Sequence, residues 1–181
     1  MPTAARPQTK RRVALPRKPA NLRQVLGELH EQRPERVPEH ATLLVAWVDL
    51  PGDNAQRTQH WAAKRRWQEA VKDHFALCLS EQPHPGLLQN PQVHIQLYVA
   101  APGDERNRTG RAKYIIDKLQ VRREVSYLRD GKAGTRVHGG YDLIADDKML
   151  NDTNCVIEEI RTKADSEHNP RRVQVWVWEA A

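Results

Sequence analysis

Hydrophobic residues recur at helical spacing in three parts of the chain. The segments 21–32, 54–80 and 107–119 each place them three or four positions apart, which is the spacing of one buried helical stripe. Asn21 precedes the first stripe and has a side chain suited to an N-cap. The stripes consist of Leu22, Val25, Leu26 and Leu29; of Trp67, Val71, Phe75 and Cys78; and of Ala112, Ile115, Ile116 and Leu119. The pattern therefore predicts three helices, the second in the later part of its segment.

Two segments between these helices have the patterns of strands. The segment 42–50 is a nearly continuous apolar run that ends at a proline and a glycine, which indicates a buried strand. In 93–99, aliphatic residues alternate with polar ones, which is typical of a strand buried on one face. This alternation predicts that His94 faces outward as an ordinary surface histidine.

Two more strands are predicted near the end of the chain, at 154–163 and 171–178. The segment 165–170 contains the polar residues and the proline of a turn, so we expect the two strands to form a hairpin. The last strand has valines on one face, and its other face ends in Trp176 and Trp178. Two tryptophans on one face require cover, either from a helix or from a second subunit.

The remaining segments are loops by their composition. Prolines and glycines mark 81–91 and 101–110. The segment 121–140 is rich in basic residues and glycine and has no regular apolar pattern, so a flexible loop is predicted there. A short apolar run follows and leads directly to Asp146 and Asp147. If that run is a strand, the two carboxylates lie at its end.

Taken in order, these elements predict an α+β fold in which helices pack on a mixed β-sheet. At 181 residues the chain is long enough for one domain with a substantial core and short for two. We expect this domain to span 42–181, with the basic insert at 121–140. The segment 21–41 is then a short helix and a linker, and the helix is expected to pack back on the core.

The net charge of +6 is concentrated at the N-terminus. Residues 1–20 contain six basic residues, no acidic residue and four prolines, so the rest of the chain is formally neutral. Such a composition buries too little apolar surface to become ordered, and it predicts a basic flexible arm. Polyanions are the natural partners of this arm, while a merely solubilising extension is the alternative.

Cysteine usage and hydropathy bear on the compartment. Cys78 and Cys155 lie within apolar patterns, as expected of buried free thiols in a cytoplasmic protein. No segment approaches the roughly 20 apolar residues of a membrane-spanning helix, and no signal-peptide core follows the first residue. The sequence thus predicts a soluble, cytoplasmic protein without a membrane partner.

Candidate chemistry lies on the third helix and just after the basic insert. Lys113 and Asp117 are four residues apart, so they project side by side from one helical face. If Asp146 and Asp147 face that helix, the carboxylates could hold Mg²⁺ or Mn²⁺, because these hard cations prefer oxygen ligands. Each motif also has a simpler interpretation: a solvated ion pair for the first, and a helix N-cap for the aspartate pair.

The combination resembles the RusA-type Holliday junction resolvases. That family has the signature R-D-x-D-N-x-x-K-x-x-x-D-x-L and a later aspartate pair. Here Lys113, Asp117 and Leu119 match its second half, and the aspartate pair and a strand with a lysine at 155–163 follow. The segment 54–67 is similar to the family's asparagine, histidine and basic residues before the first helix. The resemblance covers roughly 42–178 and implies a RusA-like fold and a homodimer.

The resemblance also implies a function. A relative of these resolvases would be a Mg²⁺-dependent endonuclease that cleaves branched DNA in recombination and repair, found with the nucleoid of a bacterial or phage system. Asp146 and Asp147 would be the principal metal ligands, Asp117 a ligand or an orienting group, and Lys113 the residue that stabilises negative charge.

Three positions of the signature differ from the family. Arg106 meets the family arginine, but Asn107 and Thr109 stand where the family has aspartates, and Gly110 stands where it has asparagine. Neutral oxygens bring no charge, so such a site should bind a metal more weakly. Asp104 lies just upstream and, with Asn107, is a further candidate ligand. The insert is also longer than the family's usual connection.

Basic residues near the proposed site are candidates for contacts to DNA phosphates. By the resemblance, the residues that would bind DNA are Asn54, His60, Lys64, Arg65, Arg106, Arg108 and Arg111. The basic insert would embrace a strand, although an insertion without a role is the alternative there, as a solvated basic face is for the helix.

Two other function classes remain open. One is a catalytically inactive DNA-binding module of the same fold, which explains the missing acids directly. The other is a protein-interaction domain whose basic arm is incidental.

Overall fold

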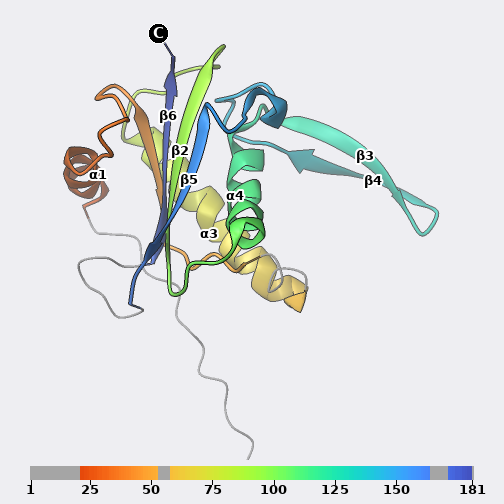
Figure 1. Cartoon of the computed structure of the whole chain (residues 1–181). Coiled ribbons are helices and arrows are strands. Elements are labelled where there is room, and N and C mark those ends of the chain that lie inside the picture. Colours follow the sequence, from red (N-terminus) through yellow and green to blue (C-terminus); the bar gives the residue numbers. More distant parts are fainter. Residues whose placement is uncertain (1–20, 53–57, 164–170, 181) are drawn as a thin grey trace, which may run out of the picture.

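The computed structural model describes residues 21–52, 58–163 and 171–180. Its centre is a four-stranded sheet in the order β1 (Thr42–Ala46), β6 (Arg172–Glu179), β2 (Pro91–Val99) and β5 (Cys155–Arg161). β6 runs antiparallel to both of its neighbours, whereas β5 runs parallel to β2. The predicted α+β class with a mixed sheet is therefore confirmed (Figure 1). The basic arm 1–20 and Asn54 lie outside the described residues.

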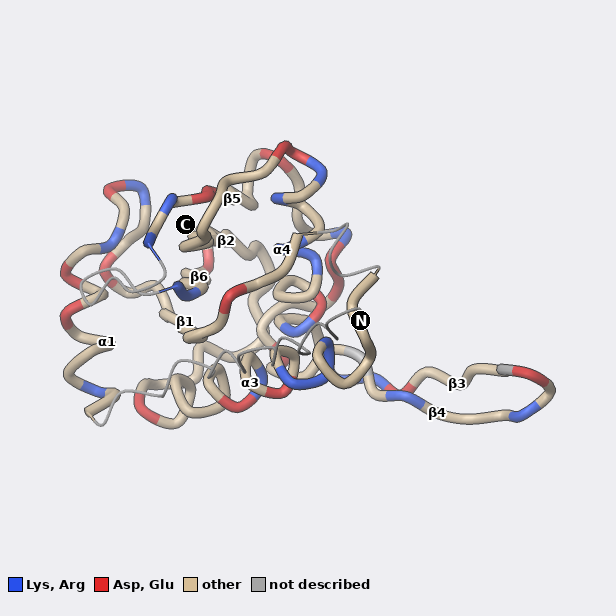
Figure 2. Tube along the Cα trace, turned by 90° about the horizontal axis from the view of Figure 1, so that it is seen from below, with Lys and Arg blue, Asp and Glu red and all other residues tan. Residues whose placement is uncertain are grey.

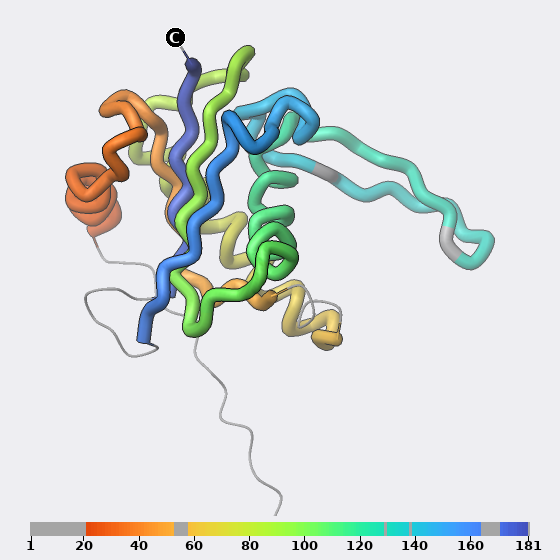
Figure 3. The backbone as a smooth tube through the Cα atoms, viewed as in Figure 1, coloured from red at the N-terminus to blue at the C-terminus, as the bar shows by residue number. Residues whose placement is uncertain are grey.

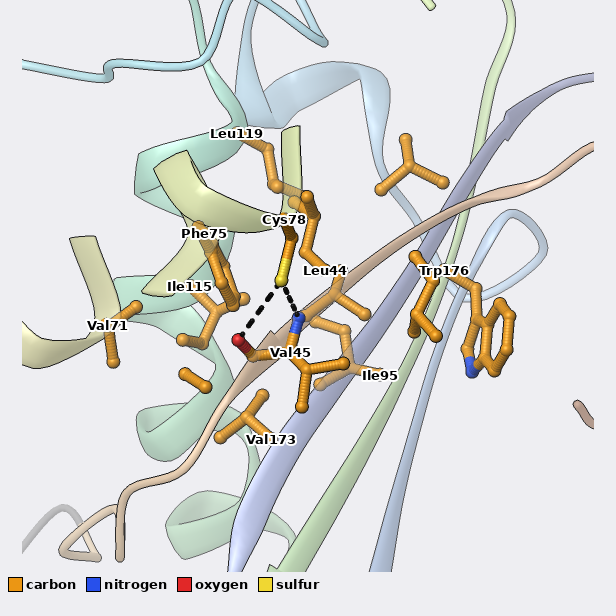
Figure 4. Packing of buried hydrophobic residues seen from close by; sticks show 14 of the residues in the cluster. Leu44, Val45, Val71, Phe75, Cys78, Ile95, Ile115, Leu119, Val173 and Trp176 are labelled. Atoms are coloured by element: carbon orange, nitrogen blue, oxygen red, sulfur yellow. Dashed lines mark hydrogen bonds between the residues drawn. The ribbon is translucent and has the colours of Figure 1, made fainter. Parts of the chain in front are cut away.

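Two long helices, α3 (Trp61–Ser80) and α4 (Glu105–Leu119), cover one face of the sheet (Figure 1). The predicted stripe of α3 is fully confirmed, because all four of its residues are buried. In α4 three of the four are buried and the fourth, Ile116, is partly buried. Figure 4 shows labelled members of both stripes, such as Phe75 and Ile115, packed near aliphatic residues of β1, β2 and β6. This layer contains most of the hydrophobic core.

A third helix, α1 (Leu22–Glu31), lies on the opposite side of the sheet (Figure 3). The Asn21 side chain accepts a hydrogen bond from the Gln24 backbone amide, which is the expected N-cap. Leu22 and Leu26 are buried in the same core cluster as the sheet, so the helix packs back on the domain as predicted. The ring of His30 meets that of Trp176 edge to face at 5.2 Å.

This second layer corrects two predictions. His94 does not face solvent: it is fully buried, because the face of β2 that it occupies is covered by the chain itself. Trp176 is also fully buried and lies opposite His94 across the β2–β6 pair. The cover that Trp176 requires thus comes from its own chain, and its burial gives no reason to expect a second subunit.

The last two strands do not form the expected hairpin. β2 lies between β5 and β6 in the sheet, so these two strands are not neighbours. The predicted turn at 165–170 is outside the described residues.

β1 is also shorter than predicted, since it ends at Ala46 although the apolar residues that follow, Trp47, Val48 and Leu50, stay buried.

The segment 121–140 is a β-hairpin and not the predicted loop. Strands β3 (Arg123–Arg129) and β4 (Lys132–His138) pair in antiparallel register and project away from the sheet and helices (Figures 1 and 2). The two residues between the strands, Asp130 and Gly131, have positive φ of 52° and 75°. Asp-Gly is a favoured pair for this turn, so a local sequence signal was present and was missed.

Two other segments differ from prediction. The segment 101–110 is a loop only as far as Asp104, where α4 begins, so Arg106 and Arg108 lie in the first turns of a helix. The short apolar run after the hairpin makes only isolated bridges instead of a strand. It leads into a 3₁₀ helix, η1 (Asp147–Met149).

Among the described residues, no helix is long and apolar enough to cross a membrane.

Candidate metal and nucleic-acid site

Lys113 of α4 lies between two carboxylates from distant parts of the sequence. Its Nζ is 3.5 Å from Oδ1 of Asp117, one turn further along the helix. It is 3.9 Å from Oδ2 of Asp147 at the start of η1. The structure thus brings together three of the four residues predicted to carry the chemistry.

Backbone hydrogen bonds at the end of α4 place η1 beside the helix. After the hairpin, the chain returns to the last turn of α4, where the amides of Leu143 and Ile144 donate to the carbonyl of Leu119 at 2.9 and 3.1 Å. All three side chains are fully buried. Because these contacts anchor the chain immediately before the aspartate pair, Asp147 stays within reach of Lys113.

The neighbouring carboxylate, Asp146, has the role of a helix cap. Its side chain accepts a hydrogen bond from the backbone amide of Lys148 at 3.1 Å, and its Oδ2 lies 3.9 Å from Nη1 of Arg123. The capping interpretation of the aspartate pair therefore holds for Asp146. Asp147 keeps its carboxylate directed towards Lys113.

The two adjacent carboxyls also perturb each other's ionisation. Hydrogen bonding with Asp146, then partial burial and the nearby negative charge, raises the pKa of Asp147 above its usual value. Hydrogen bonding with Asp147, then the bond from the Lys148 amide, lowers the pKa of Asp146. The ionisation of each acid therefore depends on that of the other, and positive charge placed beside Asp147 would favour its ionised form.

The other candidate metal ligands lie in two places: Asp104 and Asn107 at the start of α4, and Thr109 near Lys113. Asp104 is the N-cap of α4, and its Oδ1 accepts from both the backbone and the side-chain nitrogen of Asn107 at 2.9 Å. Thr109 instead lines a hollow of about 280 Å³ together with Lys113 and Asp147. Of the two positions where the family has aspartates, the structure therefore shows only Thr109 lining the same hollow as the Lys113 site.

The basic residues predicted to contact DNA have different surroundings. His60 caps α3, with its ring nitrogen accepting from the Ala62 amide. Lys64 lines a cleft beside Lys113. Arg65 is exposed and pairs with Glu69 at 2.7 Å on the same helix.

Arginines along α4 form a second group. Arg106 is exposed and Arg108 is partly exposed. Arg111 is mostly buried and forms an ion pair with Glu159 of β5. Because that pair neutralises its charge inside the protein, Arg111 supports the packing of α4 on the sheet more directly than it could bind phosphate.

The side-chain oxygens around Lys113 are of the kind that a hard cation prefers, but there are few of them. Asp117 and Asp147 offer carboxylates on either side of Lys113, and Thr109 adds a neutral oxygen. In residues 21–52, 58–163 and 171–180, no group of three or more His, Cys, Asp and Glu side chains is arranged to hold a metal ion. The donor set therefore fits Mg²⁺ or Mn²⁺ only in part.

The sequence reasoning did not name Lys118, and it placed Arg136 only within the basic insert expected to embrace a strand. Both residues lie on the other side of Lys113. The cleft there, of about 430 Å³, is lined by Lys118 of α4 and by Arg136 of β4 as well as by Lys64. Lys118 follows Tyr114 by one helical turn, and its Nζ lies 5.4 Å from that ring. Helical periodicity could have identified Lys118, whereas Arg136 required recognition of the hairpin.

Comparison of the chain with protein-family models, with curated proteins and with solved structures found no match. The likeness to RusA-type resolvases accordingly rests on the residues of the sequence alone.

Proposed function

We propose that this protein binds branched DNA and cleaves it with the help of a divalent cation, in the manner of the RusA-type resolvases that its sequence resembles. The observation that carries the proposal is the position of Lys113 between Asp117 and Asp147. A lysine beside carboxylates from two distant segments is expected at a phosphate-cleaving site. There the lysine stabilises the negative charge of the phosphate, and the carboxylates bind the metal ion.

Each of these residues has a proposed role. The Lys113 side chain is 67% exposed, so its ammonium group would be free to bind a phosphate that displaces the two carboxylates. Asp147 would hold a metal ion, and Asp117 would hold that ion or orient Lys113. A bound Mg²⁺ or Mn²⁺ would polarise the scissile phosphate and lower the pKa of a water.

Cleavage of DNA recombination intermediates would also imply a cellular location and an oligomeric state for the protein. We propose that it works in the cytoplasm at the nucleoid, as a homodimer that presents two sites to a junction. Sedimentation at micromolar concentration tests the dimer, and a purely monomeric protein would contradict it.

The second candidate is a DNA-binding module that does not cleave. A specific observation favours it: Asp104 and Asn107 bond to each other, and among the residues that the structure describes, two carboxylates pair with Lys113. This candidate keeps the basic surface and the fold and explains the neutral residues at the two family aspartate positions.

The test measures nicking of a labelled four-way junction with Mg²⁺ or Mn²⁺. For a nuclease, Lys113→Gln and Asp147→Asn should each lower the rate by about 100-fold, as expected when a charge-stabilising group or a ligand is lost. Glu28→Gln is the matched control, because this exposed residue lies on α1, on the other side of the sheet.

Three outcomes are distinguishable. Nicking by the wild type that depends on Lys113 and Asp147 supports the nuclease. Tight junction binding without any nicking supports the inactive module. If no DNA binds even at low salt, both candidates are wrong and a protein-interaction domain becomes the better explanation.

A further inference from the structure

The base of the β3–β4 hairpin forms a second wall opposite α3 and α4. Two adjoining hollows, of about 430 and 280 Å³, lie between these walls and share Lys118 and residues at the end of β4. Their basic residues come from three sources: the helix α3, the helix α4, and the hairpin with the residue just before it. In that order they are Lys64 and Lys72; Lys113 and Lys118; and Arg122 and Arg136. We call these two hollows together the basic cleft.

The basic cleft has a large excess of positive charge. Against its six cations stands one carboxylate, that of Asp117. Within the part of the chain that the structure describes, Lys113 is the member of the six that forms an ion pair. Burial, followed by the charge of Lys72, lowers the pKa of Lys118. Six cations with one carboxylate among them create a positive field that an anion would relieve.

Several contacts hold the walls of the cleft in place. The Tyr114 hydroxyl donates to the carbonyl of Gln68 at 3.0 Å, and the Tyr141 hydroxyl donates to the carbonyl of Lys72. At the hairpin base, Gly139 approaches the backbone so closely that an added Cβ would lie 2.3 Å from the carbonyl oxygen of Val121. The cations are thus presented by a supported frame.

The hairpin also carries exposed apolar side chains beyond the cleft. Leu128 near its tip is 75% exposed and Tyr127 beside it is 44% exposed, whereas Val137, which is 45% exposed, lines the cleft itself. A two-stranded ribbon has the width to enter the major groove of duplex DNA. The ribbon projects away from the helices and the sheet and has charged residues at its base and at its tip (Figure 2), which is the form of a DNA-embracing arm.

We propose that the basic cleft binds the sugar–phosphate backbone of double-stranded DNA, with α3 and α4 on one side and the hairpin on the other. A polymer fits better than a single small anion, because the six cations are spread over two hollows and several elements. This inference rests on the DNA-binding part of the proposed function but not on cleavage.

The experiment measures the affinity of the full chain for a labelled 30-base-pair duplex over a series of salt concentrations. The variants are Lys72→Gln and Arg136→Gln, both at exposed positions where loss of folding is not expected. Arg23→Gln on α1 is the matched control, since it removes one exposed positive charge on the other side of the sheet. The N-terminal arm is present in every variant, so differences between them report on the cleft.

Each cleft variant should weaken binding by roughly threefold or more and lower the slope of log K against log salt by about 0.9, the value for one lost phosphate contact. The control should match the wild type. If Lys72→Gln and Arg136→Gln bind duplex with the wild-type affinity and slope, the cleft is not the DNA path, although the proposed function survives. Inhibition by inorganic phosphate at low millimolar concentration would also overturn the inference, because it would indicate a small-anion site.

Failure of the proposed function gives a different result. In that case the wild type binds neither duplex nor junction at low salt, and the inference falls with it. Equal affinity for duplex RNA would place the partner in another class and would contradict the assignment to DNA.

Discussion

His94 occupies a fully buried position on β2, and its Nε2 lies 3.1 Å from Oε2 of Glu158. Burial lowers the pKa of His94, although the hydrogen bond and charge of Glu158 partly oppose this effect. Burial would raise the pKa of Glu158, but His94, Gln96 and Arg36 together lower it. Hence the folded protein favours a neutral imidazole beside an ionised carboxylate.

This pair makes stability depend on pH. Since the pKa of His94 is lowered on folding, the unfolded chain binds more protons, and the free energy of unfolding falls as the pH drops below about 6.5. One such group contributes at most about 1.4 kcal/mol per pH unit. Loss of the Glu158 contribution follows at lower pH, through its folded pKa. Urea unfolding of the wild type and of His94→Gln between pH 7 and pH 5 measures the effect.

The variant should flatten the pH dependence over that interval. A surface histidine replaced in the same way, His40→Gln, is the control, since this residue is exposed. Equal slopes for the wild type and His94→Gln would contradict the assignment.

Cys78 of α3 is held in the core by the edge strand. Its Sγ lies 3.4 Å from the amide nitrogen of Val45 and 3.6 Å from the carbonyl oxygen of the same residue (Figure 4). Burial raises the pKa of the thiol to about 11. Because the thiolate is the reactive form, this cysteine should be inert in the folded protein.

In a Cys155→Ala variant, Cys78 is the remaining thiol of the chain. We expect a thiol reagent at pH 8 to modify it no faster than the protein unfolds, and to modify it at once in denaturant. Absorbance of the released chromophore follows the reaction. Rapid modification of the native variant would show that α3 separates readily from β1.

At the scale of the elements, the hairpin depends on its junction with α4. Gly139 has φ +73°, and an added Cβ would lie 2.3 Å from the carbonyl oxygen of Val121 and 2.7 Å from that of Gln120. Backbone carbonyls cannot move aside as flexible side chains do. The position therefore requires glycine both for its conformation and for its space.

Substitution of two glycines should separate the effect of the left-handed conformation from the effect of the close contact at Gly139. Gly139→Ala is expected to lower the free energy of unfolding by about 2 kcal/mol or more, from the left-handed conformation and the clash together. Gly86→Ala is the matched control, because Gly86 has a similar φ of +79° with no atom within 4 Å of the added Cβ. It should lower that free energy by about 1 kcal/mol. Chemical denaturation measures both, and equal effects would contradict the close contact.

At the scale of the whole molecule, the central sheet has helices on both of its faces (Figure 3). α3 and α4 cover one face, and α1, from before the first strand, covers the other (Figure 3). His30 of α1 packs against Trp176, and Arg36 of the segment after α1 pairs with Glu158 beside His94. The stability of the domain should therefore depend on α1.

Leu26→Ala tests that dependence. Leu26 is buried in the core cluster, so its truncation should lower the free energy of unfolding by about 2 kcal/mol, at the low end for a leucine because the helix lies at the edge of the core. Tryptophan fluorescence during urea unfolding measures the change. Glu28→Ala on the exposed side of the same helix is the control, and equal effects of the two substitutions would mean that α1 does not stabilise the sheet.

Local patterns predicted much of this fold. The stripes of α1, α3 and α4 and the alternation in β2 were read from the sequence, because spacing along one element depends only on its own geometry. The hairpin also had a local signal in Asp130 and Gly131, which was overlooked among the basic residues. For the candidate site, the i to i+4 pair of Lys113 and Asp117 followed from helical spacing in the same way.

Only the tertiary structure decided what lies across from each element. Periodicity could not show that α1 covers the second face of the sheet, so His94 was predicted to be exposed. It could not show that β2 separates β5 from β6, or that Arg136 faces Lys118 across a cleft. These relations depend on packing between residues far apart in the chain. The sequence by itself determined which faces must be buried, and the packing decided what buries them.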